Sequence, residues 1–226
     1  NVKPLQNRKR HSPESVKLDK TIADESTVLL KNENQLLPLD AKSLKSIAII
    51  GPNADQVQFG DYTWSRNNKD GVTPLQGIKN RVNKNTAIHY AKGCSLTSLD
   101  TSGIAEAVEA AKNSEVAVIF GGSASAALAR DYKSSTCGEG FDLNDLNLTG
   151  AQSQLIREVY QTGTPVILVL VTGKPFVIEW EKNNLPAILV QWYAGDPAGN
   201  SIADILFAEL VPSGRGPFAC PRSPGD

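Results

Sequence analysis

Five short apolar runs, rich in β-branched residues, are the feature that most limits what this chain can fold into. They span residues 46–50, 87–90, 116–120, 166–171 and 187–191, and most of them lead into a glycine. Near-continuous apolar strands of this kind are typical of parallel sheets that are buried on both faces. Helical patterns alternate with these runs. The sequence therefore predicts a doubly wound α/β domain, an α/β sandwich with a mostly parallel sheet of about five or six strands and helices on both faces.

Helix signals occupy the segments between the predicted strands. Residues 73–76 (Thr-Pro-Leu-Gln) combine a capping box with proline at the first helical position, and residues 149–152 (Thr-Gly-Ala-Gln) are interpreted as a second capping box. Apolar residues at helical spacing predict further helices around residues 104–111 and 202–206, and one that runs from Leu18 to about Asn34.

Composition and charge exclude several classes of function. The 226 residues carry 23 Lys and Arg against 24 Asp and Glu, which argues against binding to nucleic acid or to an anionic membrane surface. No stretch approaches the roughly 20 apolar residues of a membrane span. Two histidines and three separated cysteines predict no metal site and no disulfide framework, and the cysteines are expected to be free thiols.

The ends of the sequence also carry expectations. The chain starts at Asn1 and contains no methionine, so we expect it to be a piece of a longer parent protein. The polar residues 1–20 are predicted to be a linker or the end of a preceding domain, and residues 21–226 the α/β domain. The location of the parent stays open, with a periplasmic or secreted one favoured.

Two long loops are the places to look for function, because open α/β sheets bind ligands beyond the carboxyl ends of their strands. These loops span residues 51–73 and 121–148. The turn after the first run, Gly-Pro-Asn-Ala at residues 51–54, lacks the glycines of a dinucleotide-binding fingerprint. No Gly-x-Ser-x-Gly elbow occurs, and two histidines make a His-based triad implausible. Carboxylate chemistry is what remains.

The second long loop contains Gly138-Glu139-Gly140, in which two glycines let the backbone present a carboxylate to a cleft. A lone loop glutamate is usually only solvated, but this one occurs within an ordered set of motifs. The set resembles the C-terminal α/β-sandwich domain of glycoside hydrolase family 3, the β-glucosidase and β-xylosidase family. It comprises residues 25–33 (ESTVLLKNE), 36–39 (LLPL), 47–55 (IAIIGPNAD), 60–62 (GDY), 73–78 (TPLQGI), 90–94 (YAKGC), 138–142 (GEGFD), 173–175 (GKP), 192–195 (WYAG) and 212–215 (PSGR).

The resemblance implies an active site shared between two domains. In that family a preceding (β/α)₈ barrel carries the nucleophile, an Asp, and many members take the acid/base from a Glu in a Gly-Glu-Gly-x-Asp-Arg setting. This Glu corresponds to Glu139, and it suits a retaining mechanism, which needs a second carboxyl group that acts first as an acid and then as a base. Tyr62 corresponds to the family's aromatic contact on the leaving-group side. Trp64 is a further candidate substrate contact, with packing of the loop onto the core as the alternative, and Asp142 is a candidate substrate-binding residue. Two departures are Leu143 in place of the motif's Arg and Gly216 in place of a large apolar residue.

The leading hypothesis is therefore the second domain of a retaining β-glucosidase that acts on terminal, non-reducing β-D-glucosyl residues. It needs no metal or cofactor, and its partners are a β-glucoside or oligosaccharide and the barrel of the same parent chain. A β-xylosidase or another exo-glycosidase is the alternative within the same class. A non-catalytic carbohydrate-binding or interface module is a second class, and a flavodoxin-like nucleotide binder rests on fold analogy alone.

Overall fold

Six strands form one sheet in the computed structural model, which describes residues 12–63, 65, 67–125, 136–140 and 145–223. The strand order is β1-β6-β5-β4-β2-β3, and every neighbouring pair is parallel except β1 with β6. The predicted doubly wound α/β fold is thus confirmed, with its five predicted strands as β2 to β6. The strands are β1 (Val28–Asn32), β2 (Ser46–Ile50), β3 (Ala87–Ala91), β4 (Val116–Gly122), β5 (Val166–Val171) and β6 (Ala187–Gln191).

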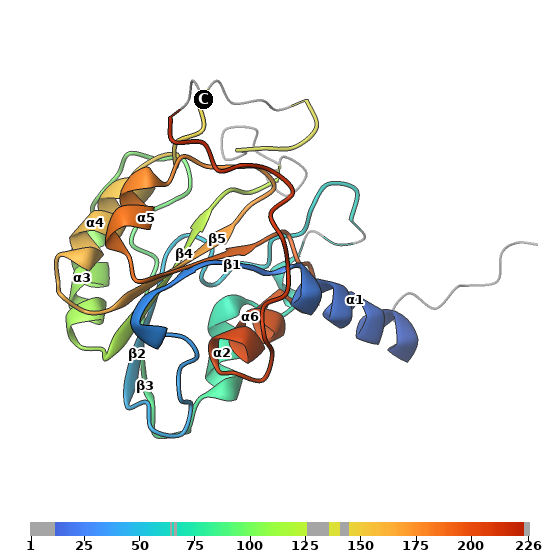
Figure 1. The fold of residues 1–226 in the computed structure, drawn as a ribbon, viewed down its shortest axis with the longest axis horizontal. Coiled ribbons are helices and arrows are strands. Elements are labelled where there is room, and N and C mark those ends of the chain that lie inside the picture. The colour runs from blue at the N-terminus through green and yellow to red at the C-terminus, as the bar shows by residue number, and fades with distance from the viewer. Residues whose placement is uncertain (1–11, 64, 66, 126–135, 141–144, 224–226) are drawn as a thin grey trace, which may run out of the picture.

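Helices cover both faces of the sheet (Figure 1). One face carries α3 (Ile104–Lys112), α4 (Gln152–Tyr160) and α5 (Glu179–Asn184). The other carries α2 (Pro74–Arg81) and α6 (Ala198–Leu206), and α1 (Pro13–Ser26) packs on α6 and projects beyond the sheet. Two short 3-10 turns, Glu33–Gln35 and Asn68–Asp70, lie in the connections.

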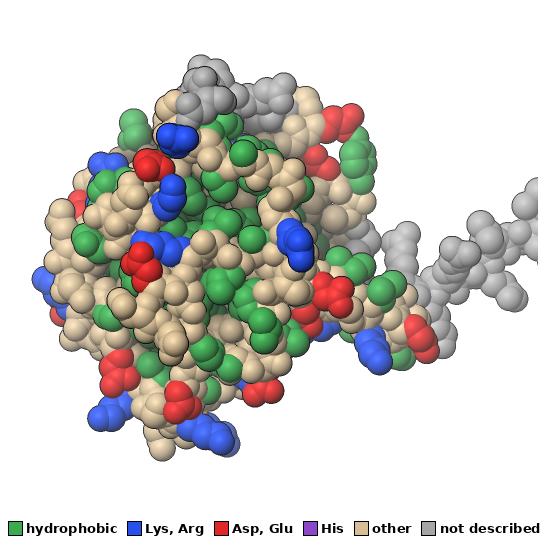
Figure 2. Space-filling view, in the orientation of Figure 1, with side chains coloured by type: hydrophobic (Ala, Val, Ile, Leu, Met, Phe, Trp, Pro, Cys, Tyr) green, Lys and Arg blue, Asp and Glu red, His purple; other side chains and the backbone are tan. Residues whose placement is uncertain are grey.

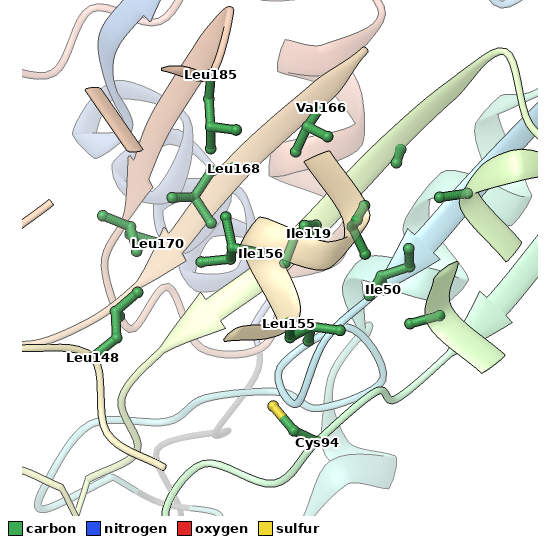
Figure 3. Close-up of a cluster of buried hydrophobic side chains, with 14 of the residues drawn as sticks. Ile50, Cys94, Ile119, Leu148, Leu155, Ile156, Val166, Leu168, Leu170 and Leu185 are labelled. Carbon is green, nitrogen blue, oxygen red and sulfur yellow. The ribbon is translucent and has the colours of Figure 1, made fainter. Parts of the chain in front are cut away.

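The core is divided by the sheet into two apolar layers, because successive strand residues point to opposite faces. In β2, Ala48 and Ile50 belong to the layer under α3 and α4, whereas Ile47 and Ile49 belong to the layer under α2 and α6. Figure 3 shows the first layer, in which Leu155 and Ile156 of α4 lie against side chains of β4 and β5. Burial on both faces explains why β2, β4, β5 and β6 are almost continuously apolar. The prediction of burial on both faces is wrong for β3, which lies at the edge of the sheet and is only partly buried.

The crossing of α2 and α6 is unusually close. A Cβ atom placed on Gly77 of α2 would lie 2.0 Å from the carbonyl oxygen of Gly199 in α6. A Cβ atom on Gly199 would lie 2.1 Å from the carbonyl oxygen of Thr73. The two backbones therefore touch at a point where neither helix can carry a side chain.

The prediction of one helix from Leu18 to about Asn34 is wrong. Helix α1 begins after Ser12, whose side chain accepts a hydrogen bond from the amide of Ser15, and it ends at Ser26. Thr27 is extended, and residues 28–32 form the edge strand β1, which pairs antiparallel with β6. Backbone pairing with β6 and the burial of Val28 override the helical spacing of the apolar residues.

One of the two predicted capping boxes is also wrong. Thr73 does cap α2, since its hydroxyl accepts a 3.2 Å hydrogen bond from the amide of Gln76. Thr149 does not cap α4, which begins only at Gln152, and the Thr149 hydroxyl instead donates to the carbonyl of Leu96 at 2.6 Å. Helix α5 was not predicted at all.

The C-terminal segment returns to the start of β1. The amide of Gly214 donates to the carbonyl of Thr27 at 3.0 Å, and the ring of Phe218 packs edge-on against Trp192. Figure 2 shows apolar side chains in the middle of the face turned to the viewer, over the edge strand β1. Leu29 and Leu30 of β1 are partly exposed. Within the described part of the chain, no helix has the length and apolar character needed to cross a membrane.

Candidate active-site loops

The two long loops meet at the point where the strand order of the sheet reverses, between β2 and β4. Strands β2 and β4 are neighbours, but β2 continues into α2 on one face and β4 into α4 on the other. Such a switch point opens a crevice beyond the carboxyl ends of the two strands, and ligands of doubly wound folds bind there. The loops predicted to carry function are therefore neighbours in space.

Asn53, in the loop after β2, fastens this loop to the end of β4. Its buried side-chain amide donates to the carbonyls of Gly121 at 3.2 Å and Ser123 at 3.3 Å. Its oxygen accepts a 2.7 Å hydrogen bond from Gln58 of the same loop. Because these bonds are shielded from water, they fix the bases of the two loops relative to one another.

The loop after β4 leaves and returns through a closed neck. Ser125 and Cys137 form a parallel bridge, and the amide of Thr136 donates to the carbonyl of Ala124 at 3.1 Å. The Thr136 hydroxyl accepts from the amide of Ala124 at 2.9 Å. The outgoing and returning strands of this loop are thus held side by side, two residues before Glu139.

Glu139 stands on a glycine turn just beyond this neck. Gly138 and Gly140 have φ values of +124° and +68°, which favour glycine because they bring a Cβ atom into conflict with the backbone. The Glu139 side chain between them is exposed. Both glycines therefore adopt backbone conformations that favour glycine, and the presentation of the Glu139 carboxylate to a cleft stays a prediction.

Asp61, in the loop after β2, links that loop to the neck and to the glutamate turn. One of its carboxylate oxygens accepts a hydrogen bond from the hydroxyl of Ser125, and the other accepts from the amide of Glu139 at 2.8 Å. The two segments are 78 residues apart in sequence. Asp61 was not among the predicted site residues, although it lies directly beside one of them.

Tyr62 follows Asp61 and projects into solvent. Its φ is +58° and 82% of its surface is exposed. It lines a groove of about 1020 Å³ between this loop and α1, which Val16 lines from the helix and Lys69 and Asp70 from the loop. Tyr62 thus presents an exposed aromatic ring to the groove beside α1.

A chain of hydrogen bonds connects Cys137 in the neck to the residues that follow β5 and β6. The Tyr193 hydroxyl lies 2.6 Å from the sulfur of Cys137 and 2.7 Å from the hydroxyl of Ser123, which donates to Thr172 at 3.0 Å. Thr172 donates in turn to the carbonyl of Lys174 at 2.7 Å. Burial raises the pKa of Tyr193, so the phenol stays protonated and can donate to Ser123.

The predicted site residues fall into two groups. Glu139 and Tyr62 lie on adjoining loops that Asp61 joins directly. Trp64 and Asp142 lie outside the described residues, as does the departure at Leu143. Gly216, another departure from the family pattern, lies in the exposed C-terminal segment.

The chemistry available at the crevice is that of carboxylates. Among the residues that the structure describes, no three His, Cys, Asp or Glu side chains are grouped closely enough to hold a metal ion. All three cysteines are free thiols, as expected, and Cys94 and Cys137 are buried. The exposed Glu139 carboxyl group, on a turn held by Asp61, is a group that can donate or accept a proton.

Comparison with known proteins identifies the family. Residues 27–226 match the model of the glycosyl hydrolase family 3 C-terminal domain. The chain belongs to glycoside hydrolase family 3. It is 39% identical over 210 residues to a β-xylosidase of Formosa agariphila and 37% identical over 228 residues to a periplasmic β-glucosidase of Salmonella typhimurium. In both comparisons 90% of this chain is covered, but only 28% of the relative.

The fold of this family 3 domain is also that of solved relatives. A β-glucosidase from Listeria innocua in complex with isofagomine superimposes with a TM-score of 0.82 and 27% identity. The match covers 98% of this chain and 30% of that protein. The C-terminal domain of family 3 therefore occurs as part of longer, multidomain glycoside hydrolases.

Proposed function

We propose that this domain supplies the acid/base carboxyl group to the active site of a retaining β-glucosidase. In this proposal Glu139 is the acid/base, and the nucleophilic Asp lies on a (β/α)₈ barrel elsewhere in the parent protein. The observation that carries the proposal is the exposed Glu139 on its glycine turn, held at the sheet's switch point. The substrate is a terminal, non-reducing β-D-glucosyl residue.

The reaction needs Glu139 in both of its protonation states. In the first step the protonated carboxyl gives its proton to the glycosidic oxygen while the nucleophile attacks the anomeric carbon, and the leaving group departs as an alcohol. In the second step the Glu139 carboxylate takes a proton from water as the water oxygen displaces the nucleophile. Tyr62 serves as a platform for the leaving-group sugar, and Trp64 and Asp142 as further substrate contacts.

A β-xylosidase is the second candidate within the same class. The relative from Formosa agariphila is a β-xylosidase, and its identity to this chain is similar to that of the β-glucosidase from Salmonella typhimurium. The same domain serves either sugar in this proposal, because the glycone is bound mainly by the barrel. Assays of the parent protein with matched aryl β-glucosides and β-xylosides distinguish the two.

A periplasmic or secreted location is proposed for the parent protein, because one of its relatives is a periplasmic β-glucosidase.

The acid/base role is tested with a Glu139→Ala variant of the full-length parent. General-acid assistance is worth about 10²–10⁴-fold and matters most when the departing oxygen needs a proton. We expect a severe loss of kcat/KM on phenyl glucosides and a much smaller loss on dinitrophenyl glucosides. Azide should restore turnover, since it attacks the glycosyl-enzyme without needing a base.

A Glu158→Ala variant is the matched control, because Glu158 is a partly exposed glutamate on α4 that accepts a hydrogen bond from Gln154 of the same helix. It should leave both substrates unaffected. An equal loss on good and poor leaving groups in Glu139→Ala would refute the acid/base assignment. In that case, binding of glucose or cellobiose by the isolated domain would favour a carbohydrate-binding module instead.

A further inference from the structure

We propose that Asp61 is the residue that positions the acid/base: its carboxylate holds the Glu139 turn in the orientation needed for proton transfer. This inference rests on the proposed function of Glu139. Asp61 itself stays off the reacting atoms and acts through the backbone of the glutamate turn.

The contacts of Asp61 place it where three chain segments meet. It lies in the loop after β2, while Ser125 lies at the outgoing end of the loop after β4 and Glu139 just beyond the returning end. One carboxylate oxygen accepts from the Ser125 hydroxyl and the other from the Glu139 amide at 2.8 Å. A single side chain therefore holds the neck and the turn to the opposite loop.

Among the residues that the structure describes, little else fixes the glutamate turn on its outer side. Gly138 and Gly140 carry no side chains that could pack, and no atom of the described part of the chain lies within 4 Å of the Cβ position of Gly140. Glycine is the residue with the most backbone freedom, so a turn of this composition needs an external tie to keep one conformation. The charge-assisted bond from the Glu139 amide to Asp61 is such a tie.

A carboxylate suits this position better than any neutral side chain. The Ser125 hydroxyl and the Glu139 amide both donate to Asp61, and an ionised carboxylate offers an acceptor oxygen to each of these two donors. An asparagine of the same shape has only one acceptor oxygen, so its NH₂ group would face one of the two donors. Asp61→Asn therefore removes one of these two hydrogen bonds with almost no change in side-chain volume.

The test uses Asp61→Asn, Glu139→Ala and the double variant in the full-length parent. A misplacement of about 1 Å can cost about 100-fold in rate, so we expect Asp61→Asn to lower kcat/KM on phenyl glucosides by about 10- to 100-fold. On dinitrophenyl glucosides, which need little acid assistance, the loss should stay below about threefold. If Asp61 acts through Glu139, the double variant should be no slower than Glu139→Ala alone.

Two further variants keep the test sharp. Ser125→Ala removes one of the two donors and should give a smaller loss with the same dependence on leaving group. Asp55→Asn is the matched control: Asp55 is an exposed aspartate of the same loop that accepts from the Thr73 hydroxyl at 2.8 Å, and its loss should not depend on leaving group. Thermal unfolding of each variant confirms that it is folded.

The outcomes separate this inference from the proposed function. Two results would overturn the positioning role while Glu139→Ala still behaves as an acid/base variant. One is that the losses of kcat/KM add in the double variant, and the other is that Asp61→Asn loses as much on good leaving groups as on poor ones. Equal losses across leaving groups in Glu139→Ala itself would overturn the proposed function, and the positioning role with it.

Discussion

Tyr62 adopts a left-handed backbone conformation although its side chain is almost fully exposed. That conformation costs a non-glycine residue about 1–2 kcal/mol, and an exposed ring recovers little of it by packing. We expect Tyr62→Gly to raise the free energy of unfolding by up to about 1 kcal/mol, measured by chemical denaturation of this chain. In the parent, the same variant should lower kcat/KM on disaccharides if Tyr62 is the platform for the leaving-group sugar, as proposed.

The Tyr62→Phe variant is the control for this residue. It keeps the ring and the β-carbon, so both stability and disaccharide hydrolysis should stay close to those of the native protein. A Tyr62→Gly variant that is less stable than the native chain would show that Tyr62 is retained for the fold rather than for binding.

The three cysteines differ in exposure, and this predicts their reactivity. Cys220 is exposed, whereas Cys94 and Cys137 are buried, and burial raises the pKa of Cys94 to about 11. At about pH 8 we expect one thiol to react rapidly with a disulfide reagent and two to react only on unfolding. Cys220→Ser should abolish the fast phase, and a fast phase that persists would contradict the structure.

The raised pKa of Cys94 also fixes the sign of a pH effect on stability. The folded state favours the neutral thiol, so its contribution is fully present below the unfolded pKa of about 8.5. It is lost as the pH rises toward about 11, where the buried thiol ionises. Cys94→Ala should therefore make stability less sensitive to pH in this alkaline range, as measured by denaturation at several pH values.

At the scale of helices and strands, the local pattern predicted the buried elements well. The bounds of β2, β5 and β6 agree with the predicted ones, because strands covered on both faces are apolar throughout. The edge strand β1 could not be found this way, since its conformation depends on pairing with β6, more than 150 residues away. Thr149 shows the same limit: its hydroxyl binds Leu96, a partner that no local motif contains.

The candidate site was predictable in its loops but not in its connections. The length and position of the two loops, and the glycines around Glu139, are visible in the sequence. The role of Asp61 is not, because the amide it binds lies 78 residues away and becomes a neighbour only through the sheet order. An aspartate next to a predicted contact, Tyr62, was the one local signal available.

The close crossing of α2 and α6 gives a prediction that opposes helix propensity. Replacing a helix-interior glycine by alanine normally stabilises by about 1 kcal/mol. At Gly77 the added Cβ would meet the Gly199 carbonyl at 2.0 Å, so we expect Gly77→Ala to destabilise the chain by about 1–3 kcal/mol. Lys79→Ala, at an exposed position of the same helix, should be nearly neutral; a stabilised Gly77→Ala would refute the crossing.

As a whole molecule, this chain corresponds to about 28% of the curated relatives that it matches. It has a complete sheet with two apolar layers, so we expect it to unfold in one cooperative transition when expressed alone. It should not hydrolyse p-nitrophenyl β-glucoside or β-xyloside, because a retaining site needs two carboxyl groups about 5–5.5 Å apart on opposite faces of the sugar. In the proposed function this domain supplies only one of the two.

The control for this prediction is the Glu139→Ala variant of the isolated chain. Turnover by the native chain well above that variant would mean that a second catalytic carboxylate lies within these residues. Turnover equal to that of the variant would agree with an active site shared with another domain.

The hydrogen bond from Gly214 to Thr27 has a consequence for circular permutation of this domain. It holds the residue before β1 next to the segment that follows α6, with the Gly214 amide nitrogen 3.0 Å from the Thr27 carbonyl oxygen. A short linker could therefore join these two points, and new termini could be opened at the exposed turn around Gly163, between α4 and β5. Such a circular permutant would keep every strand pairing of the native sheet. The same adjacency would let the domain be inserted into a surface loop of another protein without stretching its host.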